Sequence, residues 1–452
     1  GHFNGRIVVV KSTDAGGVNA FAAQDGLYTQ CIRGMEQGKT IDEYVINTAV
    51  SRVLSAKTEW DKIRAVAKDP QLQIVISNTT ELGIVPGDDK ITDAPPATFP
   101  GKLLVVLYER FRALGAQEAP GLVIIPTELI VDNGRKLKAL ILENAAKNDL
   151  GTGFIQWVEN KNHFCNSLVD RIVPGRLEPA DEERTSALLG YRDELKLMSE
   201  VFRLWAIESD SEEVKNRLSF AKADEGVVIA PDIEKFRELK LRLLNGTHTF
   251  SCALALLAGF ETVKEAMDDE AFEHYIAWLT KKEIAPVLEK KGIRYNESVS
   301  FADKVIERFK NPYLDHKWSS ISFAYTSKML LRNLPLIKES AAAAVEGTPA
   351  MALGFAAYLL LFRSRKKNDY YEREIGGKSY RLNDDKAAIL SELWEQNDES
   401  HIVDAVLACK ALWGEDWSGC TQFAAQTKQA LSLLVKDGVI ASLNTFAGTE
   451  VN

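Results

Sequence analysis

The sequence predicts two domains, an α/β domain over residues 1–231 and an all-α domain over residues 232–452. Three observations support this fold class. The chain has 452 residues, which is more than one hydrophobic core usually organises. Its first half alternates short β-rich runs with helical patterns, as in a parallel sheet whose strands are joined by crossover helices. After Pro231 the strand pattern almost disappears, and long helical patterns follow.

Short apolar runs rich in β-branched residues predict the strands of the first domain. The runs RIVVVK (6–11), LQIVISN (72–78) and GLVIIPTE (121–128) are almost continuously apolar, which is typical of strands buried on both faces of a sheet. The runs EVFRLWAIE (200–208) and EGVVIAP (225–231) are expected to be further strands that complete this domain.

Helical patterns separate these strands at TIDEYVINTAVSRVLS (40–55) and FPGKLLVVLYERFRALG (99–115). The Pro/Gly/Asp-rich stretch at 85–101 is expected to be a surface loop or lid. The helices predicted in the second domain cover residues 233–258, 262–282, 300–310, 317–332, 350–366, 384–396, 401–412 and 421–436.

Composition excludes several function classes. Lys and Arg number 55 against 64 Asp and Glu, and the net charge of −9 argues against a nucleic-acid or anionic-membrane surface. The five cysteines are scattered without a CxxC pair, which suits a reducing cytoplasm and predicts no metal site. The longest uncharged apolar run, at 350–362, is too short to span a bilayer, and no signal peptide is visible. A cytoplasmic protein is therefore expected.

Polar residues follow two of the predicted strands. Asn78, Thr79 and Thr80 come after one strand, and Glu128 comes after another. Taken singly, such residues more often cap a helix or form a turn, because Asn and Thr are favoured there. Ligands of parallel α/β sheets bind beyond the carboxyl ends of the strands. Together these residues therefore predict a cofactor-binding edge.

One feature of a dinucleotide-binding sheet is missing. Such a sheet usually begins with a strand, a glycine-rich turn and a helix whose N-terminus binds the pyrophosphate. The chain has no G-x-G-x-x-G, and RIVVVKS (6–12) resembles the second strand of such a domain. In that fold the second strand ends near the adenosine ribose, which makes Asp14 a candidate contact. We therefore expect a Rossmann-like domain without its first strand and glycine loop.

Polar residues within an apolar helical pattern are the candidate catalytic group. In LKLRLLNGTHTFSCALALLAG (239–259), the α-helical spacing places Lys240, Asn245 and His248 on one face. A lysine beside apolar residues can act as a general acid or base near neutral pH. The asparagine can donate to a developing oxyanion, and the histidine can orient a hydroxyl. Judged on composition alone, a partly exposed helix with a capping amide and a satisfied histidine is the commoner case.

LKLRLLNGTHT resembles the K-x4-N-x2-H signature of the long-chain mannitol dehydrogenase family of polyol and sugar-acid oxidoreductases. AAQDGLYT (22–29) and NTTELGIV (78–85) resemble that family's nucleotide-domain signatures. NSLVDRIVPG (166–175) and RFKNPYLDHKWSSISFAYTSK (308–328) resemble its Val-Asp-Arg-Ile and substrate segments. The residues that these segments assign to the substrate are Asp170, Arg171, His316 and Lys328.

The resemblance implies metal-independent hydride transfer between NAD(H) and a keto sugar acid. Lys240 would protonate the carbonyl oxygen as hydride arrives, Asn245 would stabilise the alkoxide, and His248 would hold a neighbouring hydroxyl. The segments QDGLYT, FPGKL, IPTELI and LVDRIVPG most resemble those of members that reduce tagaturonate to altronate in hexuronate catabolism. Members acting on fructuronate or mannitol are alternatives. Asp170 could tune Lys240 or make only a structural contact with Arg171.

The sequence also departs from the family pattern. Leu129 stands where mannitol dehydrogenases carry a second oxyanion asparagine, so that role is left to the signature asparagine unless Asn133 or Asn166 contributes. Arg237 replaces a glutamate ahead of the catalytic lysine and would suit a carboxylate-bearing substrate, although a solvated arginine is commoner. Two hypotheses from other classes stay open: a non-catalytic sugar-acid-binding relative without the nucleotide loop, and a helical interaction scaffold.

Overall fold

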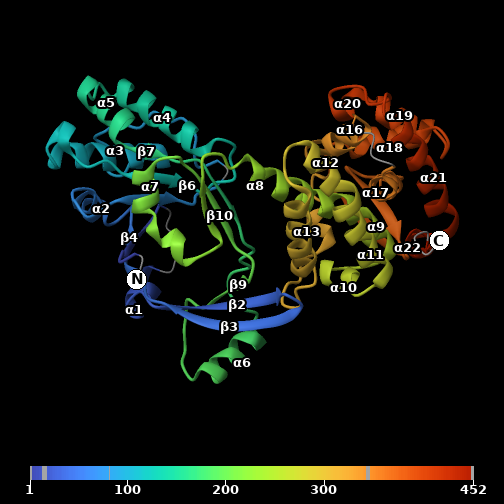
Figure 1. Cartoon of the computed structure of the whole chain (residues 1–452), viewed down its shortest axis with the longest axis horizontal. Helices are drawn as coiled ribbons and strands as arrows, with labels where there is room; N and C mark the ends of the chain where they lie inside the picture. Colours follow the sequence, from blue (N-terminus) through green and yellow to red (C-terminus); the bar gives the residue numbers. More distant parts are fainter. Residues whose placement is uncertain (1–2, 13–17, 81, 343–346, 449–452) are drawn as a thin grey trace. The chain divides into compact units, whose positions relative to one another are not determined.

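The computed structural model describes residues 3–12, 18–80, 82–342 and 347–448 (Figure 1). The chain divides into two compact units, which we call the N-terminal unit and the helical unit. The N-terminal unit comprises residues 1–33 and 41–236, and the helical unit comprises residues 34–40 and 237–452.

Strands and helices alternate in the N-terminal unit, as the sequence predicts. In chain order its elements are β1 (Ile7–Lys11), α1 (Val18–Ala23), β2 (Tyr28–Glu36), β3 (Lys39–Asn47), β4 (Val50–Ser55), α2 (Trp60–Ala67), β5 (Ile74–Ser77), α3 (Phe99–Ala113), η1 (Ala116–Glu118), β6 (Val123–Pro126), α4 (Asn133–Lys147), α5 (Thr152–Lys161), β7 (His163–Phe164), β8 (Ser167–Asp170), α6 (Pro179–Leu189), β9 (Leu197–Glu200), β10 (Leu204–Glu208), α7 (Glu212–Arg217), η2 (Ser219–Ala223) and β11 (Val227–Ala230). The strands form the parallel sheets β5-β6-β7 and β1-β4, together with β11-β10-β8 and β3-β2-β9.

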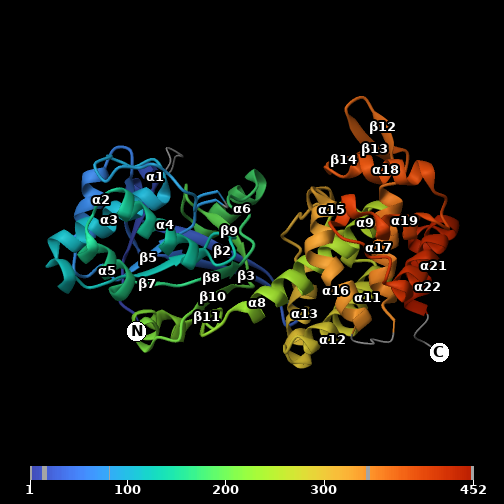
Figure 2. The ribbon, with the colours of Figure 1, turned by 90° about the horizontal axis from the view of Figure 1, so that it is seen from above.

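Strand β6 is buried on both faces, as its continuous apolar run predicts. Ile124 packs into the core formed with α3, α4 and α5, whereas Val123 and Ile125 pack into a second core with α7 and β10. Successive side chains of a strand point to opposite faces, so an unbroken apolar run fills both cores. Figure 2 shows α3 and α4 on one side of this sheet and β10 and β11 on the other.

The helix predicted over residues 40–55 is wrong, because this segment forms strands β3 and β4. Its apolar residues recur at helical spacing, but many of them are β-branched and favour extended backbone. The preceding turn reinforces the strand. Gln37 and Gly38 both have positive φ, 51° and 74°, which matches a two-residue type I′ hairpin between β2 and β3.

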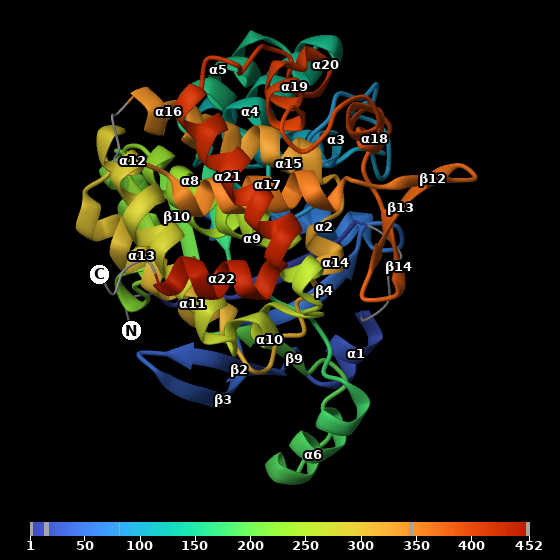
Figure 3. The ribbon, with the colours of Figure 1, turned by 90° about the vertical axis from the view of Figure 1, so that its right-hand side faces the viewer.

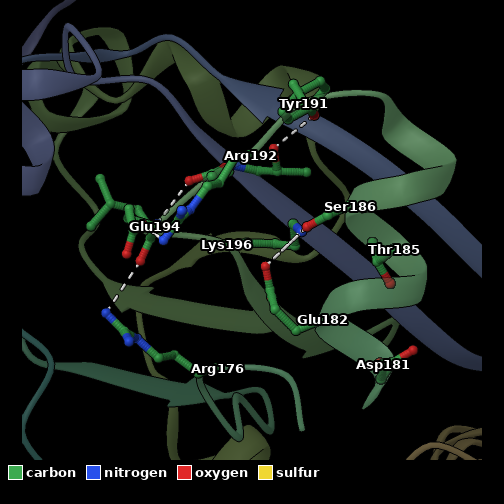
Figure 4. A network of polar contacts seen from close by, with 12 residues as sticks. Arg176, Asp181, Glu182, Thr185, Ser186, Tyr191, Arg192, Glu194 and Lys196 are labelled. Atoms are coloured by element: carbon green, nitrogen blue, oxygen red, sulfur yellow. Dashed lines mark hydrogen bonds and ion pairs between the residues drawn. The ribbon is translucent and has the colours of Figure 1, made fainter. Parts of the chain in front are cut away.

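Helix α6 is attached to the β3-β2-β9 sheet by buried charges. The fully buried Arg33 side chain of β2 forms an ion pair with Asp181 of α6. The Lys196 side chain, also fully buried, binds the neighbouring residues of the same helix, with its Nζ 2.9 Å from the Glu182 carboxylate and 2.7 Å from the Ser186 hydroxyl (Figure 4). These contacts, rather than an apolar face, hold α6 in place.

The helical unit confirms the helical character predicted for the second half of the chain. Its elements are α8 (Glu234–Glu238), η3 (Leu239–Gly246), α9 (Thr247–Ala258), α10 (Val263–Met267), α11 (Glu270–Trp278), η4 (Leu279–Ile284), α12 (Ala285–Lys290), α13 (Tyr295–Phe309), α14 (Trp318–Ile321), α15 (Tyr325–Lys328), η5 (Met329–Asn333), α16 (Leu334–Ala342), α17 (Pro349–Leu361), β12 (Arg365–Lys367), β13 (Tyr370–Ile375), β14 (Lys378–Leu382), α18 (Ala387–Gln396), α19 (Ile402–Ala408), α20 (Lys410–Trp413), α21 (Thr421–Asp437) and α22 (Val439–Gly448). Three of these, η3, η4 and η5, are π-helical.

Helix α17 forms the centre of this unit and packs against α9 and α21 (Figure 3). It is apolar all round and buried along almost its whole length, as its sequence predicts. Among the described residues, no helix is both long and apolar enough to cross a membrane. The antiparallel sheet β12-β13-β14 is not predicted from the sequence, because its strands are rich in charged residues and show no apolar alternation.

Candidate active site

Lys240, Asn245 and His248 lie on one continuous helix, but that helix is not a plain α-helix. Lys240 and Asn245 lie in the π-helical segment η3, and His248 follows in α9. Backbone hydrogen bonds in a π-helix run from residue i to i+5, so residues five apart are stacked one turn apart. Lys240 and Asn245 have this separation. The π-turn therefore aligns them more closely than the α-helical spacing assumed from the sequence.

Side chains satisfy the carbonyls where η3 changes to α9. The Thr249 hydroxyl donates to the Asn245 carbonyl at 2.8 Å, and Asn333 Nδ2 donates to the Gly246 carbonyl at 3.1 Å. The half-buried side-chain amide of Asn245 itself makes no hydrogen bond with another described residue. Its NH2 group is therefore available to a ligand.

His248 is buried in an aromatic pocket. Its ring stacks on Phe309 with a centroid distance of 4.2 Å and meets the His316 ring edge-on at 5.1 Å. Burial lowers the pKa of His248 well below its ordinary value, and the nearby His316 and Arg308 lower it further. The ring is therefore neutral near pH 7. Its buried Nε2 has no hydrogen-bond partner in the described part of the chain, and such a group usually has one.

Two further cations lie close to this pocket. The Nζ of Lys328, at the end of α15, donates to the Ile321 carbonyl at 2.8 Å. Arg332 of η5 donates from Nη1 to the Thr249 hydroxyl at 3.3 Å. Burial lowers the pKa of both side chains, and the charge of Arg332 lowers that of Lys328 further. The structure thus brings together His248 and the predicted residues His316 and Lys328.

Sequence analysis missed several residues of this pocket. Arg308 and Phe309 open the segment already recognised as a substrate segment, so their position in it was a usable signal. Arg332 lies four residues after Lys328, and residues four apart share a helix face. What the sequence spacing does not show is that the rings of Phe309 and His316 pack against His248.

Arg237 lies in α8 and is half-buried. The adjacent Glu238 pairs with Lys291 at 2.7 Å and with Arg242 at 3.3 Å. Burial by itself would raise the pKa of Glu238, but these two cations hold it below its ordinary value. Glu238 therefore stays ionised and fixes Arg242.

Asp170 and Arg171 lie at the end of β8 in the N-terminal unit. Asp170 is buried, and Arg171 Nε donates to the Glu200 carbonyl at 3.0 Å. Burial and the charge of Arg203 lower the pKa of Arg171. The contact of Asp170 with Lys240 that the resemblance implies stays a prediction.

The predicted cofactor edge brings two strand ends together. The buried Glu128 carboxylate accepts hydrogen bonds from the Ser77 hydroxyl at 3.0 Å, from Thr79 N at 2.9 Å and from the Thr79 hydroxyl at 2.7 Å. Glu128 therefore ties the end of β6 to the end of β5. Asn78 and Thr80 are exposed at the same edge. None of these residues caps a helix, since the helix after β5 begins only at α3, and Asp14 lies outside the described residues.

Neither Asn133 nor Asn166 can supply the second oxyanion donor in this structure. Asn133 Nδ2 donates to three main-chain carbonyls, those of Pro126, Glu128 and Ser167, at 2.9–3.1 Å. The Asn166 oxygen accepts from two backbone N–H groups at the start of α4, and its Nδ2 donates to Glu208 at 3.1 Å. Both amides are structural. In the described part of the chain, no three His, Cys, Asp or Glu side chains cluster as metal ligands.

Comparison with known protein families gives two matches that together cover most of the chain. Residues 2–221 match the mannitol dehydrogenase Rossmann domain. Residues 232–435 match the mannitol dehydrogenase C-terminal domain.

Curated relatives include the altronate oxidoreductase of Bacillus subtilis (strain 168), which is 38% identical over 420 residues, covering 92% of this chain and 83% of that protein. The altronate oxidoreductase of Bacteroides thetaiotaomicron is 33% identical over 442 residues, covering 98% of this chain and 90% of that protein.

Two solved structures are similar in fold. A substrate-free D-sorbitol dehydrogenase has a TM-score of 0.74 at 20% identity, covering 97% of this chain and 88% of its own. The Pseudomonas fluorescens mannitol 2-dehydrogenase, in a ternary complex with NAD and D-mannitol, has a TM-score of 0.61 at 23% identity. The match covers 95% of this chain and 85% of the mannitol dehydrogenase chain. These likenesses confirm the fold class, a Rossmann-like N-terminal domain followed by a helical C-terminal domain.

Proposed function

The chain belongs to the mannitol dehydrogenase family of oxidoreductases acting on CH–OH groups, and from that premise we propose that it reduces tagaturonate to altronate with NADH. Relatives 33–38% identical over most of the chain are named altronate oxidoreductase, which supports this substrate over a polyol. The observation that carries the proposal is the alignment of Lys240 with the uncommitted amide of Asn245 on one π-turn.

The carboxyl ends of β5 and β6 fit the nicotinamide half of NADH. A flat ring bearing an amide needs an apolar surface with a few polar partners. At this edge Leu129 is 65% exposed, and Asn78 and Thr80 are exposed as well. Asn78, Thr79 and Thr80 would hold the cofactor there, while Glu128 keeps their strand ends together. When bound, NADH supplies the hydride.

The helical unit supplies the proton and the charge stabilisation. Lys240 donates a proton from Nζ to the carbonyl oxygen, so the ketone gains one hydride and one proton and becomes an alcohol. Asn245 Nδ2 donates to the same oxygen while negative charge develops on it. His248, neutral because burial lowers its pKa, offers the unpartnered Nε2 to a neighbouring hydroxyl. In the reverse direction Lys240 acts as the base.

The reaction needs no metal ion by this mechanism, because Lys240 and Asn245 together polarise the carbonyl. We assign it to cytoplasmic hexuronate catabolism. The five cysteines are free thiols, which suits a reducing compartment.

The test is NADH oxidation by the full chain with tagaturonate, fructuronate and fructose measured side by side. We expect the highest kcat/KM with tagaturonate. Turnover of fructuronate alone would assign the chain to the neighbouring hexuronate reaction, and turnover of fructose alone would assign it to polyol metabolism. Altronate binding without any turnover would support a non-catalytic sugar-acid-binding relative.

A further inference from the structure

Beside the candidate catalytic residues lies the guanidinium of Arg332, which no carboxylate of the described residues neutralises. Its side chain is half-buried and makes one hydrogen bond, to the Thr249 hydroxyl at 3.3 Å. Within the described residues it forms no ion pair with a carboxylate. Removing a charge from water is costly unless the charge is paired and hydrogen-bonded. The folded chain leaves this cost uncompensated.

Lys328 is a second cation beside Arg332, and His316, which lies close to Lys328, is neutral rather than anionic. Lys328 lies four residues before Arg332, and its one hydrogen bond to another described residue goes to a main-chain carbonyl. Burial lowers the pKa of His316, and the charges of Lys328 and Arg308 lower it further. The nearby carboxylate of Glu238 is engaged elsewhere, by Lys291 and Arg242. A pocket with this charge distribution attracts an anion.

The position of Arg332 is fixed from two sides. Arg242 Nη1 donates to the Leu331 carbonyl at 2.9 Å and to the Arg332 carbonyl at 2.7 Å, which holds the backbone of η5 against η3. The Thr249 hydroxyl gives its one proton to the Asn245 carbonyl, so its lone pairs are left to accept from Arg332. One hydroxyl therefore links the guanidinium to the backbone of the candidate oxyanion donor.

We propose that Arg332 binds the carboxylate of the sugar acid and so selects sugar acids over neutral polyols. The remaining N–H donors of the guanidinium match a carboxylate in bidentate geometry, and Lys328 adds a second positive charge. This inference rests on the proposed function, because it assumes that the ketone end of the same molecule reacts at Lys240 and Asn245. Tagaturonate carries its carboxylate and its ketone toward opposite ends of the carbon chain.

The test compares R332Q and R332K with the wild-type chain. Binding of altronate is measured by calorimetry with NADH present. Altronate and NADH are both reduced, so they cannot react with each other. In R332Q we expect altronate to bind about 100-fold more weakly, the loss typical of two charge-assisted hydrogen bonds. R332K keeps the positive charge but lacks the planar guanidinium that can donate two parallel hydrogen bonds, so it should recover part of the lost altronate affinity.

Two controls separate binding from folding. Arg294 is a surface arginine with an exposed side chain, paired with Glu297 at 3.0 Å, and R294Q should bind altronate like the wild type. R332Q should unfold at the same temperature as the wild type or higher, because it removes an unpaired charge. A lower melting temperature, with equal losses of activity toward tagaturonate and fructose, would make Arg332 structural and overturn the proposal.

The outcomes also separate this inference from the proposed function. If the wild type binds altronate in an Arg332-dependent manner but reduces no tagaturonate, the carboxylate site stands and the proposed reaction fails. If it reduces tagaturonate and R332Q does so equally well, the carboxylate site alone is wrong. Loss of ADP-ribose or inorganic phosphate binding in R332Q, with altronate unaffected, would assign the guanidinium to the nucleotide and overturn the proposal. Absence of altronate binding to the wild type would overturn it as well.

Discussion

Replacing Glu238 with Gln should weaken both the helical unit and the proposed substrate site in it. The Glu238 and Arg242 side chains are only 13% and 8% exposed, and removing one partner of a buried pair costs about 3–5 kcal/mol. The cost should fall to about 2 kcal/mol here, since Arg242 keeps its two carbonyl acceptors and a neutral amide of the same shape replaces the carboxylate. Lys291 keeps a second carboxylate, Glu339, at 2.9 Å.

Urea unfolding followed by tryptophan fluorescence measures this loss. With a slope of about 2–3 kcal/mol per molar urea, the E238Q midpoint should fall by about 0.7–1 M. The matched control is E399Q, which breaks an exposed pair with Arg363 at 2.8 Å and should shift the midpoint far less. Equal shifts in the two variants would refute the argument that Glu238 anchors Arg242.

The pH dependence of the same variant checks the sign of the effect. Cations hold the folded-state pKa of Glu238 below its ordinary 4.5. Its contribution to stability is therefore complete above pH 4.5 and is lost as the pH falls through the folded-state pKa. The gap between wild type and E238Q should narrow below about pH 4.5. Because Arg242 holds the carbonyl of Arg332, E238Q should also raise the KM for tagaturonate. An unchanged KM would show that the pocket does not depend on this anchor.

Three further predictions concern Lys240, His248 and Lys196. K240A should lower kcat with tagaturonate by about 10²–10⁴-fold at an unchanged melting temperature, and steady-state rates near those of the wild type would contradict its role in proton transfer. Because the folded-state pKa of His248 is depressed, the unfolded chain binds a proton at this residue near pH 6.5 but the folded protein does not. As the pH is lowered below 6.5, the free energy of unfolding should therefore decrease less steeply in H248Q than in the wild type. Urea midpoints at pH 7.5, 6.5 and 5.5 measure this, and parallel slopes would contradict it. K196M should expose α6 to proteolysis by removing the buried bonds to Glu182, with K62M, which breaks an exposed pair at 2.8 Å, as the control. Equal cleavage of both variants would show that Lys196 does not hold α6.

Much of the fold could be predicted because segments buried on all sides have uninterrupted apolar sequences. The run around Ile124 was identified as a strand because both of its faces are buried, so no polar alternation interrupts it. Helix α17 was identified because it is buried all round and its sequence is apolar throughout. The segment at 40–55 was assigned wrongly because β3 is largely exposed on both faces, which leaves strand propensity to compete with an accidental helical period. The sheet β12-β13-β14 was missed because its strands are rich in charged residues and have no apolar alternation.

The candidate site could be predicted in its residues but not in its geometry. Resemblance pointed to Lys240, Asn245, His248, His316 and Lys328, and the structure brings the last three of these together. Asn133 and Asn166 were left open as oxyanion donors because their main-chain partners come from Pro126, Ser167 and the start of α4, which are adjacent only in the folded chain. Arg332 belongs to no recognised motif, and what distinguishes it is that no carboxylate of the described residues pairs with it, which is a property of the folded chain.

The π-helical segments explain why the signature has the spacing it has. On an α-helix, Lys240 and Asn245 would be rotated by about 140° from one another, at the two edges of the broad face that the sequence spacing predicts. On η3 the same five-residue separation is the i to i+5 repeat of the backbone itself. The widened turn is stabilised from within the helix by the Thr249 hydroxyl and from outside it by the Asn333 amide, and Asn333 comes from the π-helical segment η5 that also carries Arg332. The proposed proton donor, oxyanion donor and carboxylate anchor therefore depend on one another's backbone geometry. A substitution at Asn333 should accordingly disturb all three, although this residue touches no substrate.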